Sequence, residues 1–181
     1  NLLWGCVELS KQQASVLTYS VMGKLCILGE DIGNYELSGK LQTNLLLWKH
    51  PVQLQAGGYM KYLMPDYFLE TYYSNHFNWN NPLKNEYKTR IYGTLDIPEL
   101  GFRFNATVEN LNHLVYFNTS AIPTQHSGNI QVVSANWKQH LAWGILNWDN
   151  DLVYQVSSQP DILPLPDLTV YSNLYVKGTL S

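Results

Sequence analysis

Charged residues are scarce in this chain of 181 residues. Lys, Arg, Asp and Glu make up only 14% of it, against about 25% in ordinary soluble domains. The formal net charge is −3, and the basic residues form no cluster that would give nucleic acid an electrostatic footprint. We therefore expect no nucleic-acid partner.

Long hydrophobic runs are also missing. The densest run is Leu45 to Trp48, whereas a membrane-spanning helix needs about 18 or more apolar residues. This excludes a helical membrane protein. The chain opens at Asn1 without a charged segment followed by an apolar one, so no signal peptide is visible. Because apolar alternation continues almost to Ser181, we interpret residues 1–181 as a single domain that is incomplete at one or both ends.

Catalytic and metal-binding motifs are absent from the sequence. It has no GxSxG, GxxxxGK or GxGxxG pattern. The histidines are scattered without an HxH or HxxxH pair, at His50, His76, His113, His126 and His140. The two cysteines, Cys6 and Cys26, lack metal-type spacing; they are either unpaired strand residues or a disulfide across neighbouring strands of an exported protein. We expect no enzyme, metal or cofactor.

What the chain does have is long alternation of apolar and polar residues. The clearest stretch puts apolar residues on odd positions, at Tyr35, Leu37, Gly39, Leu41, Thr43, Leu45 and Leu47. Polar residues lie between them, at Glu36, Ser38, Lys40, Gln42 and Asn44. Successive strand side chains point to opposite faces, so this pattern indicates one apolar and one polar face. The length of such stretches, well beyond the roughly 5 to 6 residues of ordinary strands, is typical of strands that cross a membrane.

The alternation predicts about ten antiparallel strands. We expect them at residues 2–9, 14–29, 34–48, 52–63, 86–97, 100–109, 112–118, 129–138, 140–157 and 168–180. Long connections follow at 64–85, 118–128 and 158–167, and Gly57-Gly58 marks a bulge or a close approach of strands. This strand list places the first long connection at the opposite end from the other two, although outer-membrane barrels keep their long loops at one end.

Aromatic and amide residues supply the polarity that charges do not. Aromatic residues reach 13%, with 13 Tyr and 6 Trp, and such rings suit the interfacial zone of a bilayer. They are densest in the connection Pro65 to Pro82. We interpret this segment either as a loop that packs against the wall or rim of a barrel, or as a loop folded inward that contacts solute. Its candidate contact residues are Tyr73, Asn75, His76 and Trp79.

Three segments carry a resemblance to a known family. They are Tyr73–Asn81 (YSNHFNWNN), Val115–Asn118 (VYFN) leading to Pro123–Gln125 (PTQ), and Leu152–Gln155 (LVYQ) before Asp161–Pro166 (DILPLP). In order and spacing they resemble the β-barrel porins of Bacteroidota outer membranes. The resemblance implies an outer-membrane barrel that forms a diffusion channel, with no catalytic residues to carry over. Members of that family are considerably longer than this chain, which agrees with an incomplete barrel.

We therefore predict an all-β, antiparallel transmembrane β-barrel of outer-membrane type that serves as a porin-like channel for passive diffusion of small solutes. Its partners would be the lipid bilayer of the bacterial outer membrane, small hydrophilic solutes and other outer-membrane proteins. The candidate pore-lining residues have the polar parity of three strands, and are Glu36, Lys40, Gln42, Asn44, Lys88, Arg90, Arg103, Asn105 and Glu109. Their mixed signs predict weak ion selectivity.

Other hypotheses use the same alternation. A soluble all-β carbohydrate-binding module would turn the apolar face inward and stack sugars on Trp79, Trp143 and Trp148. A glycoside-processing enzyme would use Asp149 or Asp151, which share a strand face. A barrel that does not conduct would be a structural subunit of a larger outer-membrane complex.

Overall fold

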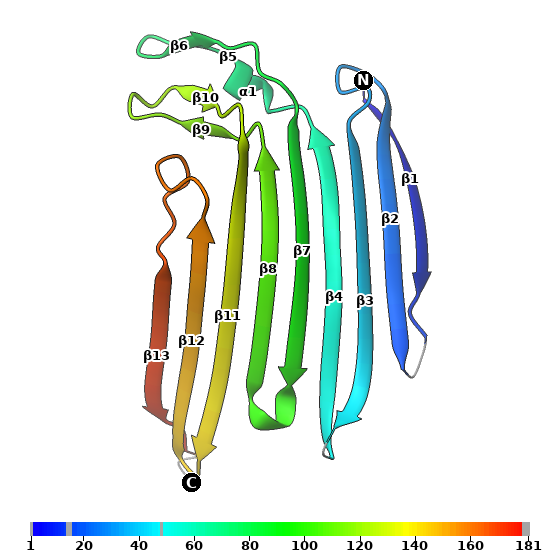
Figure 1. Cartoon of the computed structure of the whole chain (residues 1–181), viewed down its shortest axis with the longest axis vertical. Helices are drawn as coiled ribbons and strands as arrows, with labels where there is room; N and C mark the ends of the chain where they lie inside the picture. Colours follow the sequence, from blue (N-terminus) through cyan, green and yellow to red (C-terminus); the bar gives the residue numbers. More distant parts are fainter. Residues whose placement is uncertain (1, 14–15, 48, 179–181) are drawn as a thin grey trace.

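One nine-stranded antiparallel sheet dominates the computed structural model, which describes residues 2–13, 16–47 and 49–178 (Figure 1). Its strands follow one another along the chain in the order in which they pair. They are β1 (Leu3–Lys11), β2 (Leu17–Leu28), β3 (Tyr35–Leu47), β4 (His50–Leu63), β7 (Glu86–Ile97), β8 (Phe102–Asn112), β11 (Asn129–Trp143), β12 (Leu146–Ser157) and β13 (Leu168–Val176). The prediction of an all-β antiparallel fold is confirmed.

Small elements occupy the connections between these strands. A helical turn and a short hairpin lie between β4 and β7, namely α1 (Tyr67–Glu70), β5 (Thr71–Tyr73) and β6 (Asn78–Asn80). A second short hairpin, β9 (Val115–Phe117) with β10 (Pro123–Gln125), lies between β8 and β11, and the 3-10 turn η1 (Pro98–Leu100) joins β7 to β8. Within the described residues, no helix is both long enough and apolar enough to cross a membrane.

The sheet is open in the described part of the chain. β1 pairs only with β2 and β13 pairs only with β12, so each leaves one edge free. The closed barrel of the prediction is therefore not seen among these residues. The predicted strand ends at residues 14–15, Trp48 and 179–180 lie outside the described residues.

The predicted strand at residues 112–118 is wrong as a strand of the main sheet, although Val115–Phe117 within it does form a short strand of a separate sheet. β8 continues to Asn112, and His113 then takes a positive φ of 57° that turns the chain out of the sheet. Val115–Phe117 pairs only with Pro123–Gln125. These residues therefore belong to a connection and not to the main sheet. Val115, Tyr116 and Phe117 form a short run with high strand propensity, which predicts a strand but not the sheet to which it belongs.

The predicted boundary between 129–138 and 140–157 is also wrong. β11 extends to Trp143, and β12 begins at Leu146 after a tight turn in which Gly144 has a φ of 61°. Trp143 pairs with Leu146 across this turn. A single glycine beside the apolar Ile145 carries too weak a turn signal for the sequence to place it.

The first of these corrections resolves the conflict over loop sides, because it removes one strand between the first long connection and the other two. With nine main strands, the connections 29–34, 64–85, 113–128 and 158–167 all lie at one end of the sheet, and the short turns lie at the other (Figure 1). We call these the long-loop end and the short-turn end. This is the arrangement that outer-membrane barrels use.

The break predicted at Lys49-His50-Pro51 is shorter in the structure, since β4 already begins at His50. Pro51 pairs with Leu46 on β3, while the pairing of β4 with β7 starts only at Gln53. Proline is tolerated at this position because β4 extends here beyond its second neighbour.

Candidate functional site

The strand registers divide the sheet into a polar face and an apolar face. No register shift interrupts the pairing from β2 through β8, and directly opposed residues of neighbouring strands share a face. All the predicted pore-lining residues consequently lie on the polar face: Glu36, Lys40, Gln42 and Asn44 from β3, Lys88 and Arg90 from β7, and Arg103, Asn105 and Glu109 from β8. The sequence pattern placed them together correctly. A role in lining a pore stays a prediction.

Near the long-loop end, an upper charged cluster crosses five strands. Glu36 lies between Lys24 and Lys61, 3.7 Å from each Nζ. Lys88 pairs with Glu86 at 2.8 Å, and Arg90 pairs with Glu109 at 2.6 Å.

Tyr59 contacts both acidic and basic members of this cluster. Its hydroxyl donates to Glu109 at 2.7 Å. The cations of Lys61 and Arg90 lie 5.3 and 5.5 Å from the centre of its ring, within the range of a cation–π contact.

Uncharged side chains cross the middle of the polar face in one row, namely Gln42, Gln55, Thr94 and Asn105. The cation of Lys40 lies beside this row. Lys40 lies opposite Gly57. A Cβ at Gly57 would come within 2.8 Å of the Tyr92 ring carbon that bears the hydroxyl, so the Tyr92 ring lies across Gly57. The Gly57-Gly58 pair is therefore a close approach and not a bulge, since the register of β4 with β7 is continuous.

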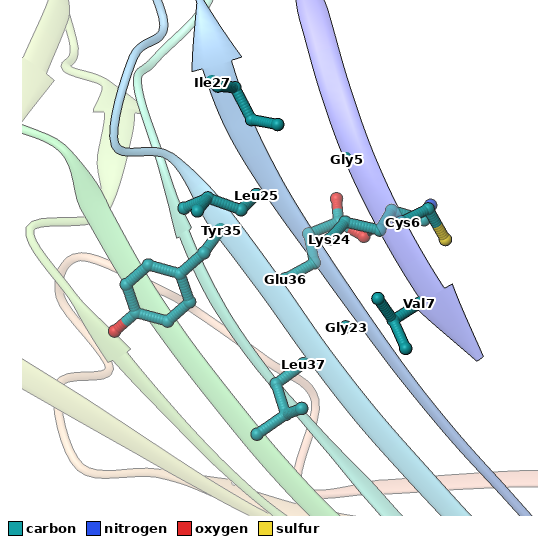
Figure 2. Close-up of a pocket in the computed structure, with 10 residues that line it drawn as sticks. All are labelled: Gly5, Cys6, Val7, Gly23, Lys24, Leu25, Ile27, Tyr35, Glu36 and Leu37. Atoms are coloured by element: carbon teal, nitrogen blue, oxygen red, sulfur yellow. Dashed lines mark ion pairs between the residues drawn. The ribbon is translucent and has the colours of Figure 1, made fainter. Parts of the chain in front are cut away.

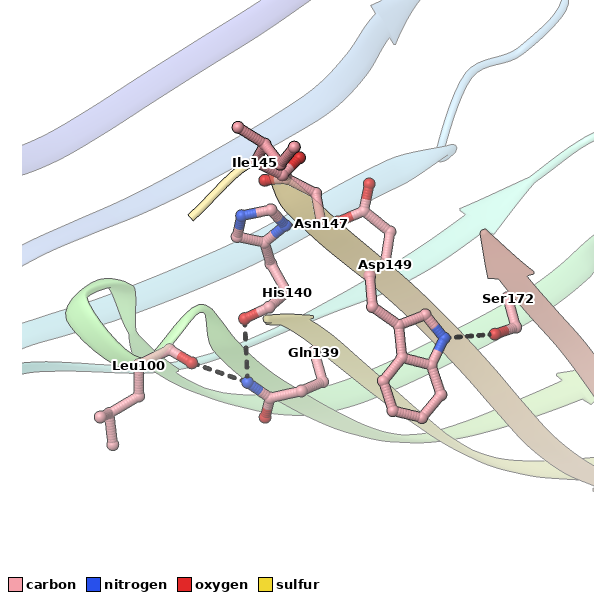
Figure 3. Close-up of polar contacts among 8 residues, drawn as sticks. Leu100, Gln139, His140, Ile145, Asn147, Asp149 and Ser172 are labelled. Carbon is pink, nitrogen blue, oxygen red and sulfur yellow. Dashed lines mark hydrogen bonds and ion pairs between the residues drawn. The ribbon is translucent and has the colours of Figure 1, made fainter. Parts of the chain in front are cut away.

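A lower charged cluster lies toward the short-turn end. Arg103 donates to Asp96 from Nε and from a terminal nitrogen, at 3.0 and 2.5 Å, and Asp96 is nearly buried. Lys138 pairs with Asp151 at 2.8 Å. His140 contacts Asp149 at 2.5 Å (Figure 3). The two aspartates considered as catalytic residues thus each have a basic partner.

The loop 113–128 covers the polar face at the long-loop end. Leu111 and Ile130 have the polar-face parity, yet they are only 9% and 0% exposed. The backbone N–H of Val115 donates to Glu86 at 2.8 Å, which holds the loop over this face. Two of the four buried hydrophobic residues in the described part of the chain therefore lie beneath this loop, the other two being Cys26 and Val52.

The same loop is tied to the preceding long connection. The side chain of Gln125 donates to the carbonyls of Lys84 and His113 at 2.6 and 2.9 Å, and its oxygen accepts from the Lys84 N–H. Asn81 donates to the carbonyl of Pro123, which is fully buried. The two connections form one rim.

The apolar face is uncovered across all nine strands. Its aliphatic side chains stay largely exposed, as Val7 on β1, Ile91 on β7 (73% exposed) and Val170 on β13 illustrate. Small residues leave hollows between them, such as one of about 580 Å³ over Gly5 and Gly23 (Figure 2). The exception to this exposure among the described residues is Val52 on β4, which is only 4% exposed near the short-turn end.

Aromatic rings border the apolar face at both ends. Tyr35, Tyr62 and Tyr87 lie side by side in register near the long-loop end, and the first two stack at 5.6 Å. The rings near the short-turn end are Phe102, Phe104, Trp137, Trp143 and Trp148.

Polar groups among the latter rings have partners. Trp148 donates to Ser172 at 2.8 Å. Gln139 donates to the Leu100 carbonyl at 2.7 Å (Figure 3).

Comparison with protein families gives this geometry a context. A family model described as "Putative porin" matches residues 5–181, nearly the whole chain. The chain belongs to this porin family. No curated protein matches the sequence.

The predicted loop contacts of this porin-family chain lie in the β5–β6 hairpin. Trp79 stacks on Tyr72 at 4.9 Å and donates to the Phe68 carbonyl, so it stabilises the hairpin. Tyr73, Asn75 and His76 are exposed at its tip. The loop that covers the polar face is instead 113–128, for which the sequence predicted a long connection at 118–128 but no contact with the polar face.

The three tryptophans of the sugar-binding hypothesis do not come together in this porin-family sheet. Trp79 lies at the long-loop end, whereas Trp143 and Trp148 lie at the short-turn end with ring centres 6.5 Å apart. They form no common stacking platform.

Several polar-face residues of this porin-family sheet were missed by sequence reasoning, namely Tyr59, Lys61, Glu86, Asp96 and Lys138. The sequence could have predicted them, because they occupy the same alternate positions as the other polar residues of the predicted strands. Gly57 and Tyr59 interrupt the polar pattern of 52–63, which concealed that strand's polar face. The cysteines are free, Cys6 exposed and Cys26 buried.

Proposed function

We propose that this porin-family chain forms the wall of an outer-membrane channel through which small hydrophilic solutes diffuse passively. In this proposal the apolar face lies against lipid and the polar face lines water. The observation that carries it is the apolar face left uncovered over all nine strands. Soluble antiparallel sheets bury one face in a core, and exposed apolar patches this extensive mark interaction with a membrane or a partner.

The height of the apolar face supports a bilayer as its partner. On β7, the outward positions run from Tyr87, in the tyrosine row, to Ile97, beside Phe102. Ten residues rise about 33 Å along a strand, or about 25 Å at the tilt of roughly 40° usual in barrels. An apolar band of about 25 Å between two aromatic girdles is the pattern of outer-membrane barrels.

The two free sheet edges require partners in the proposed membrane. Lipid offers no hydrogen bonds to the backbone groups of β1 and β13, and each unpaired group costs several kcal/mol in hydrocarbon. The edges would pair with each other or with further strands to close a barrel. The total strand number and the pore diameter depend on that closure.

The rim supports a channel narrowed at one mouth. The loop 113–128 covers the polar face at the long-loop end and is held there through Glu86 and Gln125. Following the usual arrangement of such barrels, we place the long loops outside the cell and the short turns in the periplasm. Solutes would be sorted by size at this rim, with no chemical step and no cofactor.

Conductance across a planar lipid bilayer tests the proposal. The purified protein, reconstituted at low density, is expected to give discrete and stable current steps in potassium chloride. A variant in which 115–125 is replaced by a short Gly-Ser linker should give larger steps, because the rim is removed. A matched shortening of 158–167 leaves this cover in place and should change the steps less.

Other results would reject the channel. A protein that inserts into lipid and never conducts would instead be a structural subunit of a larger outer-membrane complex, a role that the two free edges would also serve. A protein that stays in solution without detergent would contradict the membrane assignment altogether.

A further inference from the structure

The ion pairs of the polar face share one arrangement, in which the acidic and the basic side chains lie at different heights above the sheet. In each pair with a Lys or Arg, the base is more exposed than the acid. The side chain of Arg90 is 42% exposed against 15% for Glu109, and that of Arg103 is 56% exposed against 13% for Asp96. The acids therefore lie close to the sheet, and the bases extend beyond them.

This layering matters because the charge count is balanced. The basic residues of the polar-face strand positions are Lys24, Lys40, Lys61, Lys88, Arg90, Arg103 and Lys138. The acidic ones are Glu8, Glu36, Glu86, Asp96, Glu109, Asp149 and Asp151. A count alone predicts no preference between ions of opposite sign. A solute passing along the face, however, meets the basic groups first.

Three cations lie together in the upper charged cluster, and two of them contact the Tyr59 ring. Lys61 lies directly opposite Lys88 across β4 and β7, a placement of like charges that destabilises a sheet. Arg90 follows Lys88 on the same face and shares the Tyr59 ring with Lys61. Their acidic partners Glu36, Glu86 and Glu109 lie on other sides of the cluster and are less exposed than the bases they pair with.

We propose that the polar face favours anions, and that Lys61, Lys88 and Arg90 beside Tyr59 on neighbouring strands form a subsite for small carboxylate or phosphate anions below the rim. The inference rests on the proposed channel. Mixed charges predicted weak ion selectivity, whereas basic groups that extend farther into the lumen than the acidic groups should favour anions. An anion between Lys61 and Lys88 would relieve the repulsion between them.

Reversal potentials in a potassium chloride gradient test the preference. The wild-type channel should pass chloride more readily than potassium. The variant Lys61→Gln/Lys88→Gln should lower the chloride-to-potassium permeability ratio roughly threefold, the change that a shift of about half a kT in the lumen potential produces, because such a shift acts on the two ions in opposite directions. This variant keeps Glu36 paired with Lys24 and Glu86 bonded to Val115. The control Lys49→Gln/Lys177→Gln removes the same charge from exposed positions outside the main strands and should leave the ratio unchanged.

A second measurement tests the subsite without conduction. Inorganic phosphate, at the ionic strength of a chloride reference, should raise the Tm of the detergent-solubilised wild type and of the control, but not that of Lys61→Gln/Lys88→Gln. A channel that prefers potassium, or equal permeability shifts in both double variants, would overturn the anion preference. Equal phosphate effects on all proteins would overturn the subsite. A protein that binds phosphate but never conducts would remove the channel and leave the subsite standing.

Discussion

At the scale of single residues, the polar face is stabilised by pairs whose members differ in burial. Asp96 is nearly buried, and Arg103 supplies its charged partner. Removing a partner from a buried charge costs more than removing an exposed pair, because the remaining group cannot recover its hydration. The pairs of the face should therefore respond unequally to substitution.

Arg103→Ala is expected to lower the free energy of unfolding by about 1–3 kcal/mol, since it leaves Asp96 unpaired. Lys138→Ala should cost less than about 1 kcal/mol, because Asp151 is more exposed and keeps its bond from Asn136. Urea unfolding in lipid vesicles, followed by tryptophan fluorescence, measures both. Equal losses would show that burial of Asp96 plays no part.

Two glycines on adjacent strands should also behave differently. A Cβ at Gly57 would meet Tyr92 and, at 2.9 Å, the carbonyl oxygen of Gly39, whereas a Cβ at Gly39 has open space. Gly57→Ala is expected to cost about 1–3 kcal/mol through overpacking, and Gly39→Ala to be neutral or slightly stabilising. The same unfolding assay compares them, and a neutral Gly57→Ala would contradict the placement of the Tyr92 ring.

At the scale of elements, the sequence predicted most long strands and the division of their faces. Alternation in 35–47 and 86–97 was long enough to fix both. The misplaced elements depend on backbone turns with weak sequence signals, a positive φ at His113 and a single glycine at position 144. The rim could not be predicted, because its bonds join residues far apart in the chain, such as Lys84 and Gln125.

Gln125→Ala tests how the rim is held. Loss of the bond from the Lys84 N–H, worth about 1 kcal/mol, should make amide exchange at Lys84 roughly fivefold faster. Asn75→Ala, at the exposed tip of the β5–β6 hairpin, serves as a control and should leave that rate unchanged. Unaltered exchange in Gln125→Ala would mean that other contacts hold the two connections together.

At the scale of the whole molecule, the two faces of the sheet meet different solvents in the proposed channel, lipid on one side and water on the other. Ile91 lies at the middle of the apolar face and is largely exposed, so in a soluble protein a charge there would cost little. In a bilayer, Ile91→Arg should cost about 2–4 kcal/mol, whereas Gln42→Arg on the polar face should cost less than about 0.5 kcal/mol. Urea unfolding in vesicles separates the two cases.

The most direct test of the central claim uses the neighbouring residues Leu41 and Gln42. Each is replaced by cysteine in a background in which Cys6 and Cys26 are serine, and the protein is reconstituted in vesicles. The account predicts that Leu41→Cys reacts with a lipid-soluble maleimide and resists a water-soluble one, while Gln42→Cys shows the reverse. Equal labelling of both positions by the water-soluble reagent, or the opposite parity, would contradict it.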